Sequence, residues 1–378
     1  MKAIHRHILM LSAVFLSASL LSGCWDQREL DELGVPFIVG YDYVKKEEKE
    51  YPEDKYLISE GLPIFYEDTV QKYHVDTSPG ILVGETRGRR NSHFGEQIIL
   101  GQIQVVLFGE EIASNEDITE LTDTLSRNPA VKGAIPVAVA KGRAVDILKM
   151  PVKQYPNPGI YIQLLLRNID RTNFFPTTTM FEIYRDVISN YTAPLVPYII
   201  QKEGDIVVAG SCLLNEGKRM AHLGREETET AVFLRGIRGS GVISFDVTED
   251  DKVIDQATFA GENSRKVKIK KGEDRYIIDI LIKLSGELVE RKKSQAVVDD
   301  KDFIMLSQKS LEDIIKKRAE DFVRKVQEEY GFDALNVGKE IKAHCREKHT
   351  KEAMDRVIKE SEINVEVKVQ IDNAGGKI

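Results

Sequence analysis

Apolar and polar residues in the first half of the chain follow the patterns of strands and short helices. Apolar runs at 35–42 and 55–64 flank the charged segment 45–50, which predicts a long hairpin with a solvated tip. The run at 98–108 is nearly continuous in large apolar and β-branched residues, as in a strand buried on both faces. Strand and helix patterns then alternate, which indicates a mixed α/β unit. They lie at 118–125 (helix), 135–140 (strand), 142–148 (helix), 160–169 (helix) and 180–188 (helix).

A boundary is predicted near 193–204, where Pro194 and Pro197 precede the turn signal at Gly204. The helix expected at 308–330 carries one apolar stripe, which we interpret as core packing rather than a partner-binding face. The other elements expected beyond the boundary are strands at 206–214, 231–234, 241–247, 265–269, 276–284 and 363–371, with helices at 337–345 and 351–359.

We therefore predict an α+β or mixed α/β fold of two to three compact subdomains, each a mostly antiparallel or mixed sheet packed with helices. The expected divisions are a signal peptide at 1–23, an N-terminal mixed α/β region at 24–200 with one or two subdomains, and a C-terminal α+β domain at 201–378. The length of 378 residues fits two or three folded units at roughly 150 residues each.

The first residues have the parts of an export signal. Lys2 and Arg6 precede an apolar run at 8–21, which is shorter than the roughly 18 residues that a membrane-spanning helix needs. The run ends in Leu21-Ser22-Gly23-Cys24, which has the form of a bacterial lipobox. We therefore predict that residues 1–23 are removed and that Cys24 carries the lipid. Two acyl chains there suffice for stable attachment, because each buried CH₂ contributes about 0.8 kcal/mol.

Charge and composition narrow the choice of partners. The chain is 42% hydrophobic and 30% charged, so it can bury a core, and its net charge of −8 argues against nucleic acid as the main partner. Loss of Lys2 and Arg6 with the signal leaves −10, so the folded body is not expected to lie flat on anionic lipid. Cys212 and Cys345 then remain, and they either pair or stay as buried free thiols.

The sequence contains only weak candidates for catalytic and ligand-binding motifs. No G-x-S-x-G elbow, G-x-x-x-x-G-K-[ST] loop or H-E-x-x-H helix is present. The Gly-rich segment 236–241 precedes a predicted strand, so we interpret it as a turn between strands rather than a phosphate loop. His344, Cys345 and His349 could bind zinc, but without a second ligand cluster they are better explained as a helix end.

Two charged clusters have both a functional and a structural interpretation. Glu226 and Glu227 could form an acid and base pair, but adjacent residues point in different directions, and a helix start is the simpler interpretation. Arg87, Arg89 and Arg90 could bind an acidic partner or a lipid headgroup, although a solvated loop is the default interpretation. We predict no enzyme activity, no cofactor and no metal site.

Several segments in order resemble the Ger(x)C family, the C subunits of nutrient germinant receptors in endospore-forming bacteria. The lipidated start at 21–30 is similar to the family's Gly-Cys-Trp-Asp opening followed by Arg-Glu-Leu, although Gln27 stands where Arg is common. His344 and Cys345 stand where an aromatic residue is expected nearby. The other similar segments are 101–111, Asn128-Pro129 with 139–142, 223–228 with 232–236, 333–338 and the terminal alternating strand.

The resemblance implies a lipoprotein on the outer face of the spore inner membrane that works with two integral-membrane subunits to turn nutrient binding into germination. It implies a mixed α/β fold of three compact subdomains and no catalytic residues, and it does not imply that this subunit itself binds the nutrient. The alternative is a substrate-binding lipoprotein of a transporter, which would have two similar lobes around a cleft. A surface hydrolase is disfavoured by the missing nucleophile and metal motifs.

Overall fold

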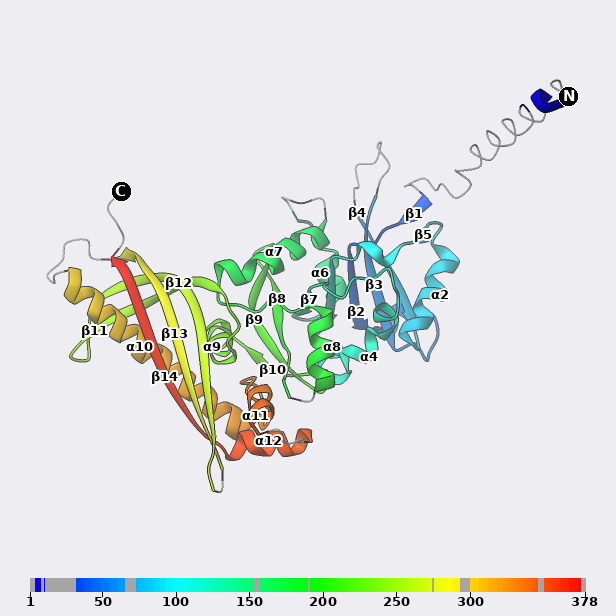
Figure 1. Ribbon diagram of the computed structural model, residues 1–378. Coiled ribbons are helices and arrows are strands. Elements are labelled where there is room, and N and C mark those ends of the chain that lie inside the picture. Colours follow the sequence, from blue (N-terminus) through cyan, green and yellow to red (C-terminus); the bar gives the residue numbers. More distant parts are fainter. Residues whose placement is uncertain are drawn as a thin grey trace.

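Three sheets covered by helices make up the described part of the chain in this computed structural model (Figure 1). The structure describes residues 4–7, 10, 32–64, 73–152, 155, 157–189, 191–273, 275–292, 300–345 and 350–374. The two large sheets have eight and four strands, and β1 (Leu33–Gly34) forms a short parallel pair with β5 (Gln97–Ile98). The predicted fold class, sheets of mixed type packed with helices, is confirmed.

The eight-stranded sheet has a parallel centre and two antiparallel edges. Its order is β10-β9-β8-β7-β6-β2-β3-β4, with β2, β6, β7 and β8 parallel. The meanders β2-β3-β4 and β8-β9-β10 extend it on either side. The strands are β2 (Ile38–Tyr43), β3 (Tyr56–Pro63), β4 (Tyr73–Gly80), β6 (Val105–Gly109), β7 (Val137–Ala140), β8 (Leu195–Lys202), β9 (Asp205–Asn215) and β10 (Lys218–Leu223).

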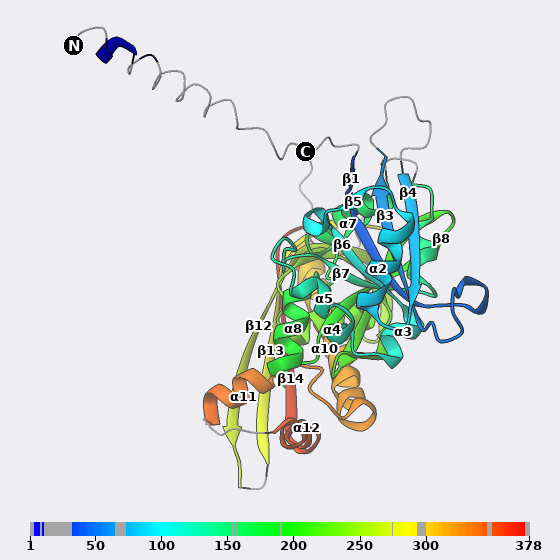
Figure 2. The same ribbon diagram turned by 90° about the vertical axis from the view of Figure 1, so that its right-hand side faces the viewer.

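Helices cover both faces of this sheet and leave a separate apolar core on each. One core holds α3 (Glu110–Asn115), α4 (Ile118–Leu121), α5 (Asp123–Ser126) and α8 (Met180–Ser189). The other holds α6 (Ala144–Leu148) and α7 (Pro158–Thr172). Helix α2 (Val83–His93) lies across β3 and β4, as the view from its side shows (Figure 2). The sheet is therefore buried on both faces at its centre.

The four-stranded sheet is packed against one long helix. Its order is β11-β12-β13-β14, antiparallel except for the last pair, and α10 (Asp300–Lys325) lies along it, followed by a π-helical turn at Val326–Tyr330. Every second residue of β13 points to the core, which explains its alternating pattern. The remaining elements are β11 (Ser240–Glu249), β12 (Lys252–Lys271), β13 (Tyr276–Arg291), β14 (Glu362–Ala374), α9 (Arg225–Arg235), α11 (Gly338–Cys345) and α12 (Lys351–Glu360).

Two predictions in the N-terminal half have different outcomes. The hairpin is confirmed, because β2 and β3 pair antiparallel around the charged connection, which contains a short 3-10 turn at Lys46–Glu48. The single strand at 98–108 is wrong, since β5 ends at Ile98 and a 3-10 turn at Leu100–Gln102 separates it from β6. The turn brings Gly101 against the backbone of Ala130, where a side chain would have little room.

The strand predicted at 231–234 is wrong, because these residues lie in α9. All residues from Thr228 to Arg235 are buried, so the helix has no polar face that would reveal its period. Gly236, with a φ of 68°, ends the helix in the left-handed conformation. The segment 236–241 therefore joins a helix to strand β11 and is not the predicted turn between two strands.

The division expected at residue 200 falls beside the tight turn between β8 and β9. These two strands pair with each other along their length, and both belong to the eight-stranded sheet, which continues to Leu223. The core of the four-stranded sheet also includes Leu195, Leu213 and Leu223 from the larger sheet. Helix α9 lies at this junction and contacts strands of both sheets.

Candidate functional site

Cys24, the predicted lipidation residue, lies outside the described residues, as does Trp25 beside it. The fold begins nearby, at β1, which pairs with β5 beside α2 (Figure 1). Within the described ranges, no helix combines the length and apolar character needed to cross a bilayer. The lipid anchor remains a prediction from the sequence.

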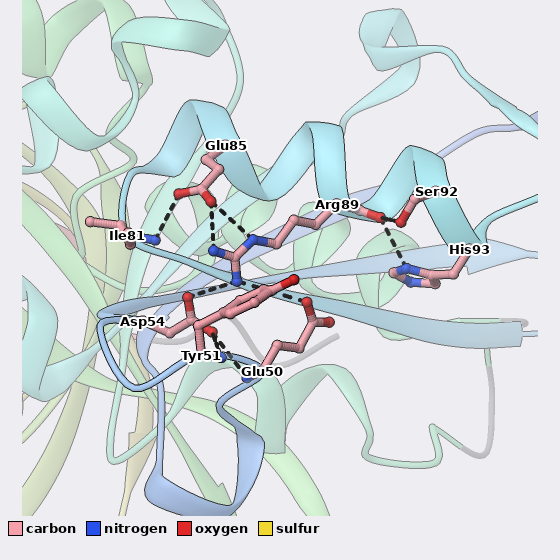
Figure 3. A network of polar contacts seen from close by, with 8 residues as sticks. All are labelled: Glu50, Tyr51, Asp54, Ile81, Glu85, Arg89, Ser92 and His93. Carbon is pink, nitrogen blue, oxygen red and sulfur yellow. Dashed lines mark hydrogen bonds and ion pairs between the residues drawn. The ribbon is translucent and has the colours of Figure 1, made fainter.

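The arginines at 87–90 lie on helix α2 rather than in the predicted solvated loop. Arg89 donates from Nη1 to Asp54 Oδ1 at 2.7 Å and from Nε to Glu85 Oε1 at 3.1 Å, and its guanidinium lies over the ring of Tyr51 (Figure 3). Asp54 also accepts from the backbone N–H groups of Glu50 and Tyr51, at 3.0 and 2.9 Å. This network holds the tip of the β2–β3 connection against α2. The guanidinium of Arg89 therefore stabilises the fold.

Arg90 is buried and forms an ion pair with Glu60 of β3, which is buried as well. Arg87 is exposed on the same helix. The three arginines thus have three environments, and the alternative of a basic patch for an acidic partner or a lipid headgroup is reduced to Arg87. Glu85 and Arg89 are four residues apart, a spacing that brings opposite charges together on one face of a helix. This spacing is the signal in the sequence that indicates a helix here.

Glu226 and Glu227 start helix α9, which confirms the structural interpretation. Glu227 accepts from the backbone N–H of Gly224 at 3.3 Å and pairs with Lys325 at 2.5 Å. Glu226 pairs with Arg318 at 2.8 Å. Each carboxylate therefore forms an ion pair with a basic side chain on α10.

Asp333 organises the 333–338 segment that carries part of the family resemblance. Its Oδ1 accepts from the backbone N–H groups of Leu335 and Val337, and its Oδ2 accepts from Gly338 at 2.7 Å. Next to it, the buried Arg235 at the end of α9 donates to the carbonyls of Ala334 and Ala193, at 2.9 and 2.7 Å. This segment ties α11 to α9 and to the start of β8.

Asp42 lies beside the end of the resembling segment 101–111, and nothing in the sequence singled it out. Its carboxylate accepts from the backbone N–H groups of Ala144 and Val145, at 2.8 Å each, and so caps α6 from strand β2. Gly109, at the end of β6, lies so close that a Cβ would overlap the Asp42 carboxylate. Burial raises the pKa of Asp42 to about 6, while the two N–H groups and Arg143 act in the opposite direction.

The cysteines and histidines give no metal centre within the described residues, where no cluster of three or more ligating side chains occurs. Cys212 is buried on β9, and burial raises the pKa of its thiol to about 12, which disfavours the reactive thiolate. The side chains of His344 and Cys345 lie outside the described part, as does His349. Cys212 is a free thiol, which is the unpaired one of the two alternatives that the sequence left open.

Two domain families of known proteins match this chain along nearly its whole length. Residues 26–201 match the spore germination protein N-terminal domain, and residues 209–375 match the spore germination B3/GerAC-like C-terminal domain. The chain belongs to the GerAC-like, or Ger(x)C, family of spore germination proteins. The recognition made from the sequence motifs is confirmed.

Two Ger(x)C relatives align with this chain over nearly their full length despite low identity. Spore germination protein YndF of Bacillus subtilis (strain 168) is 24% identical over 98% of this chain and 97% of its own. Spore germination protein B3 of the same organism is 20% identical over 96% of this chain and 97% of its own. The crystal structure of the GerBC protein covers 92% of this chain with a TM-score of 0.54 at 15% identity, which shows a shared fold.

Proposed function

We propose that this protein is a lipid-anchored, non-catalytic subunit of a nutrient germinant receptor and is required for spore germination. In this proposal an S-diacylglyceryl and N-acyl modification at Cys24 holds it on the outer face of the spore inner membrane. There it contacts two integral-membrane receptor subunits. The observation that carries the proposal is the match of both halves of the chain, residues 26–201 and 209–375, to spore germination domains.

The roles of four acidic residues in or near the resembling segments support a subunit without catalytic chemistry. Asp42 and Asp333 are buried and accept hydrogen bonds from backbone N–H groups, while Glu226 and Glu227 form ion pairs with basic side chains on α10. A general acid or base has to reach a substrate proton. The carboxylates of these four residues are instead engaged in contacts between strands and helices.

The anchor is tested by Cys24→Ala in spores, with Cys345→Ala as a second cysteine variant outside the export signal. Mass analysis of the N-terminal peptide is expected to find the lipid in the parent protein and in Cys345→Ala, and no lipid in Cys24→Ala. We expect the Cys24→Ala chain to leave the membrane fraction and the nutrient response to fall. An unmodified Cys24 in the parent protein would overturn the anchor.

The partners are tested by purification from detergent-solubilised spore membranes. Recovery of two integral-membrane germination proteins with this chain is the expected result. Recovery with a permease and an ATPase would instead favour a transporter-binding lipoprotein. That alternative is disfavoured by the unequal sheets, of eight and four strands, since such binders use two similar lobes.

A further inference from the structure

A polar pocket of about 370 Å³ lies where the C-terminal end of α7 meets the four-stranded sheet. Its volume is near the lower end of the roughly 300–1,000 Å³ that is typical of small-molecule sites. The described residues that line it are all charged, polar or glycine, without an apolar side chain among them. Such a lining disfavours a hydrophobic ligand and suits one whose surface consists of hydrogen-bonding groups.

The Gly-rich segment 236–241 forms one wall of this pocket. Asn263 of β12 is 5% exposed and holds the segment in place. Its Oδ1 accepts from the N–H of Gly239 at 2.9 Å, and its own backbone N–H donates to the carbonyl of Gly239 at 3.2 Å. Gly239 also packs so closely on α7 that a Cβ there would lie 2.9 Å from the carbonyl oxygen of Asp170. The wall is therefore fixed between β12 and the end of α7.

Two arginines lie at this contact, Arg171 on the last turn of α7 and Arg238 next to Gly239. Ser240 Oγ donates to the carbonyl of Arg171 at 2.8 Å, which ties the two backbone segments together. Both arginine side chains are exposed, and neither has an ion-pair or hydrogen-bond partner among the described residues. Guanidinium groups donate parallel hydrogen bonds to phosphate oxygens, so two unpaired ones that line the same pocket indicate an anion site.

The other side chains of the lining suit hydroxyl groups. Glu262 and Ser264 on β12 and Ser285 on β13 are exposed and have no side-chain partner within the described ranges. Glu262 lies directly opposite Ser285 in the register, so both side chains are on the same face of the sheet. A carboxylate accepts hydrogen bonds, and a serine hydroxyl both donates and accepts. Asp170 also lines the pocket, but its Oδ1 is buried and does not reach a ligand.

We propose that this pocket binds a polyol phosphate, with the phosphate at the two arginines and the hydroxyl groups at Glu262 and Ser285. The ligand would join the end of α7, which covers the eight-stranded sheet, to strands of the four-stranded sheet. Glycerol phosphate has this chemistry, and it occurs both as a free ester and as the headgroup of phosphatidylglycerol. The proposal does not rest on the receptor role proposed above.

Three soluble probes test the two halves of the ligand. Equilibrium dialysis of the detergent-solubilised full chain would use sn-glycerol 3-phosphate, inorganic phosphate and glycerol at constant ionic strength. We expect saturable binding of glycerol 3-phosphate, binding of phosphate that is about tenfold weaker or more, and still weaker binding of glycerol. No saturable binding of glycerol 3-phosphate at millimolar concentrations, or equal binding of this ester and phosphate, would overturn the proposal.

Lipid added to the same micelles distinguishes the two sources of the ester. Displacement of bound glycerol 3-phosphate by phosphatidylglycerol, but not by phosphatidylcholine, assigns the pocket to a lipid headgroup. Displacement by neither lipid assigns it to the free ester. Equal displacement by both lipids would contradict the requirement for a polyol, because the choline headgroup has no hydroxyl group.

The location is tested at the exposed arginines, which leaves the core undisturbed. Arg171→Ala and Arg238→Ala are each expected to weaken the binding of glycerol 3-phosphate about tenfold or more. Arg167→Ala is the matched control, because Arg167 is an exposed arginine on the same helix that does not line the pocket. Its affinity should stay within about twofold of the parent. Unchanged binding in both pocket variants would show that the ester binds elsewhere and would overturn the assignment.

Glu262→Ala tests the orientation of the ligand. It removes an acceptor for the hydroxyl groups, so we expect binding of glycerol 3-phosphate to weaken about fivefold or more. The affinity for inorganic phosphate should stay the same or rise, because a negative charge has been removed. An equal loss for both probes would contradict the placement of the hydroxyl groups at Glu262.

Discussion

Asp42 is a single buried carboxyl group with a structural role that cannot be predicted from the sequence. It is 2% exposed and caps α6, whose own N-cap residue, Arg143, makes no side-chain capping bond. The partner segments lie about a hundred residues downstream, so no local pattern around Asp42 indicates the contact. Its role could be found only once the parallel strands β2 and β6 were placed side by side.

Asp42 also makes the free energy of unfolding fall as the pH rises, the opposite of the usual effect of a carboxyl group in a folded protein. Its pKa is raised to about 6 in the folded chain, above the value of about 3.9 for an unfolded aspartate. Between these values the folded state holds more protons than the unfolded state, so the free energy of unfolding falls as the pH rises from about 4 to 6. A shift of about 2 units corresponds to at most about 3 kcal/mol.

We expect the free energy of unfolding of Asp42→Asn not to fall in this way between pH 4 and pH 6. The difference in stability between the variant and the parent should therefore shift in favour of the variant as the pH rises from 4 to 7. Urea unfolding at several pH values, on protein produced without residues 1–24, measures the difference. Asp123→Asn, a half-exposed aspartate on α5, serves as control. A variant that instead loses stability relative to the parent toward pH 7 would mean that the two N–H bonds outweigh burial.

At the scale of elements, α10 supplies much of the core of the four-stranded sheet. Leu311 is fully buried against that sheet, whereas Met305 on the same helix is 62% exposed. We expect Leu311→Ala to lower the free energy of unfolding by about 2–5 kcal/mol and Met305→Ala to change it by less than about 0.5 kcal/mol. Denaturant unfolding of both variants measures this, and similar losses in the two would contradict the assigned helix face.

The amphipathic elements were predictable from the sequence, and the fully buried ones were not. α10, α7 and β13 each bury one face, so their period appears in the order of residues. α9 is buried on every side from Thr228 onward, so its run Ala231 to Leu234 shows no helical period and its pattern predicts a strand. For the arginines of α2 the sequence predicts a solvated loop for a different reason. Their ion-pair partners Asp54 and Glu60 are 30 to 35 residues away in the sequence, so no local pattern indicates that Arg89 and Arg90 are bound within the fold.

For the whole molecule, the strand order sets where the chain can be divided. The two family domains meet between residues 201 and 209, yet β8 and β9, on either side, are neighbours in one sheet. A fragment that ends at residue 201 removes β9 and β10 and exposes the edge of β8, and exposed strand edges promote aggregation.

We expect a fragment of residues 32–223, which keeps all eight strands, to stay soluble and unfold cooperatively, and a fragment of residues 26–201 to aggregate. Size-exclusion chromatography and circular dichroism compare the two. If the shorter fragment were monomeric with a cooperative transition, the eight-stranded sheet would not be a single folding unit.

If Cys24 carries the proposed lipid, the position of the β1–β5 pair sets how the molecule is oriented on the bilayer. β1 begins at Leu33, nine residues after Cys24, and a fully extended tether of that length reaches about 30 Å. The pair lies on the side of the molecule away from the four-stranded sheet (Figure 1). A connection this short to an acylated Cys24 would keep the eight-stranded sheet nearest the lipid. The four-stranded sheet and α10 would then point away from the membrane.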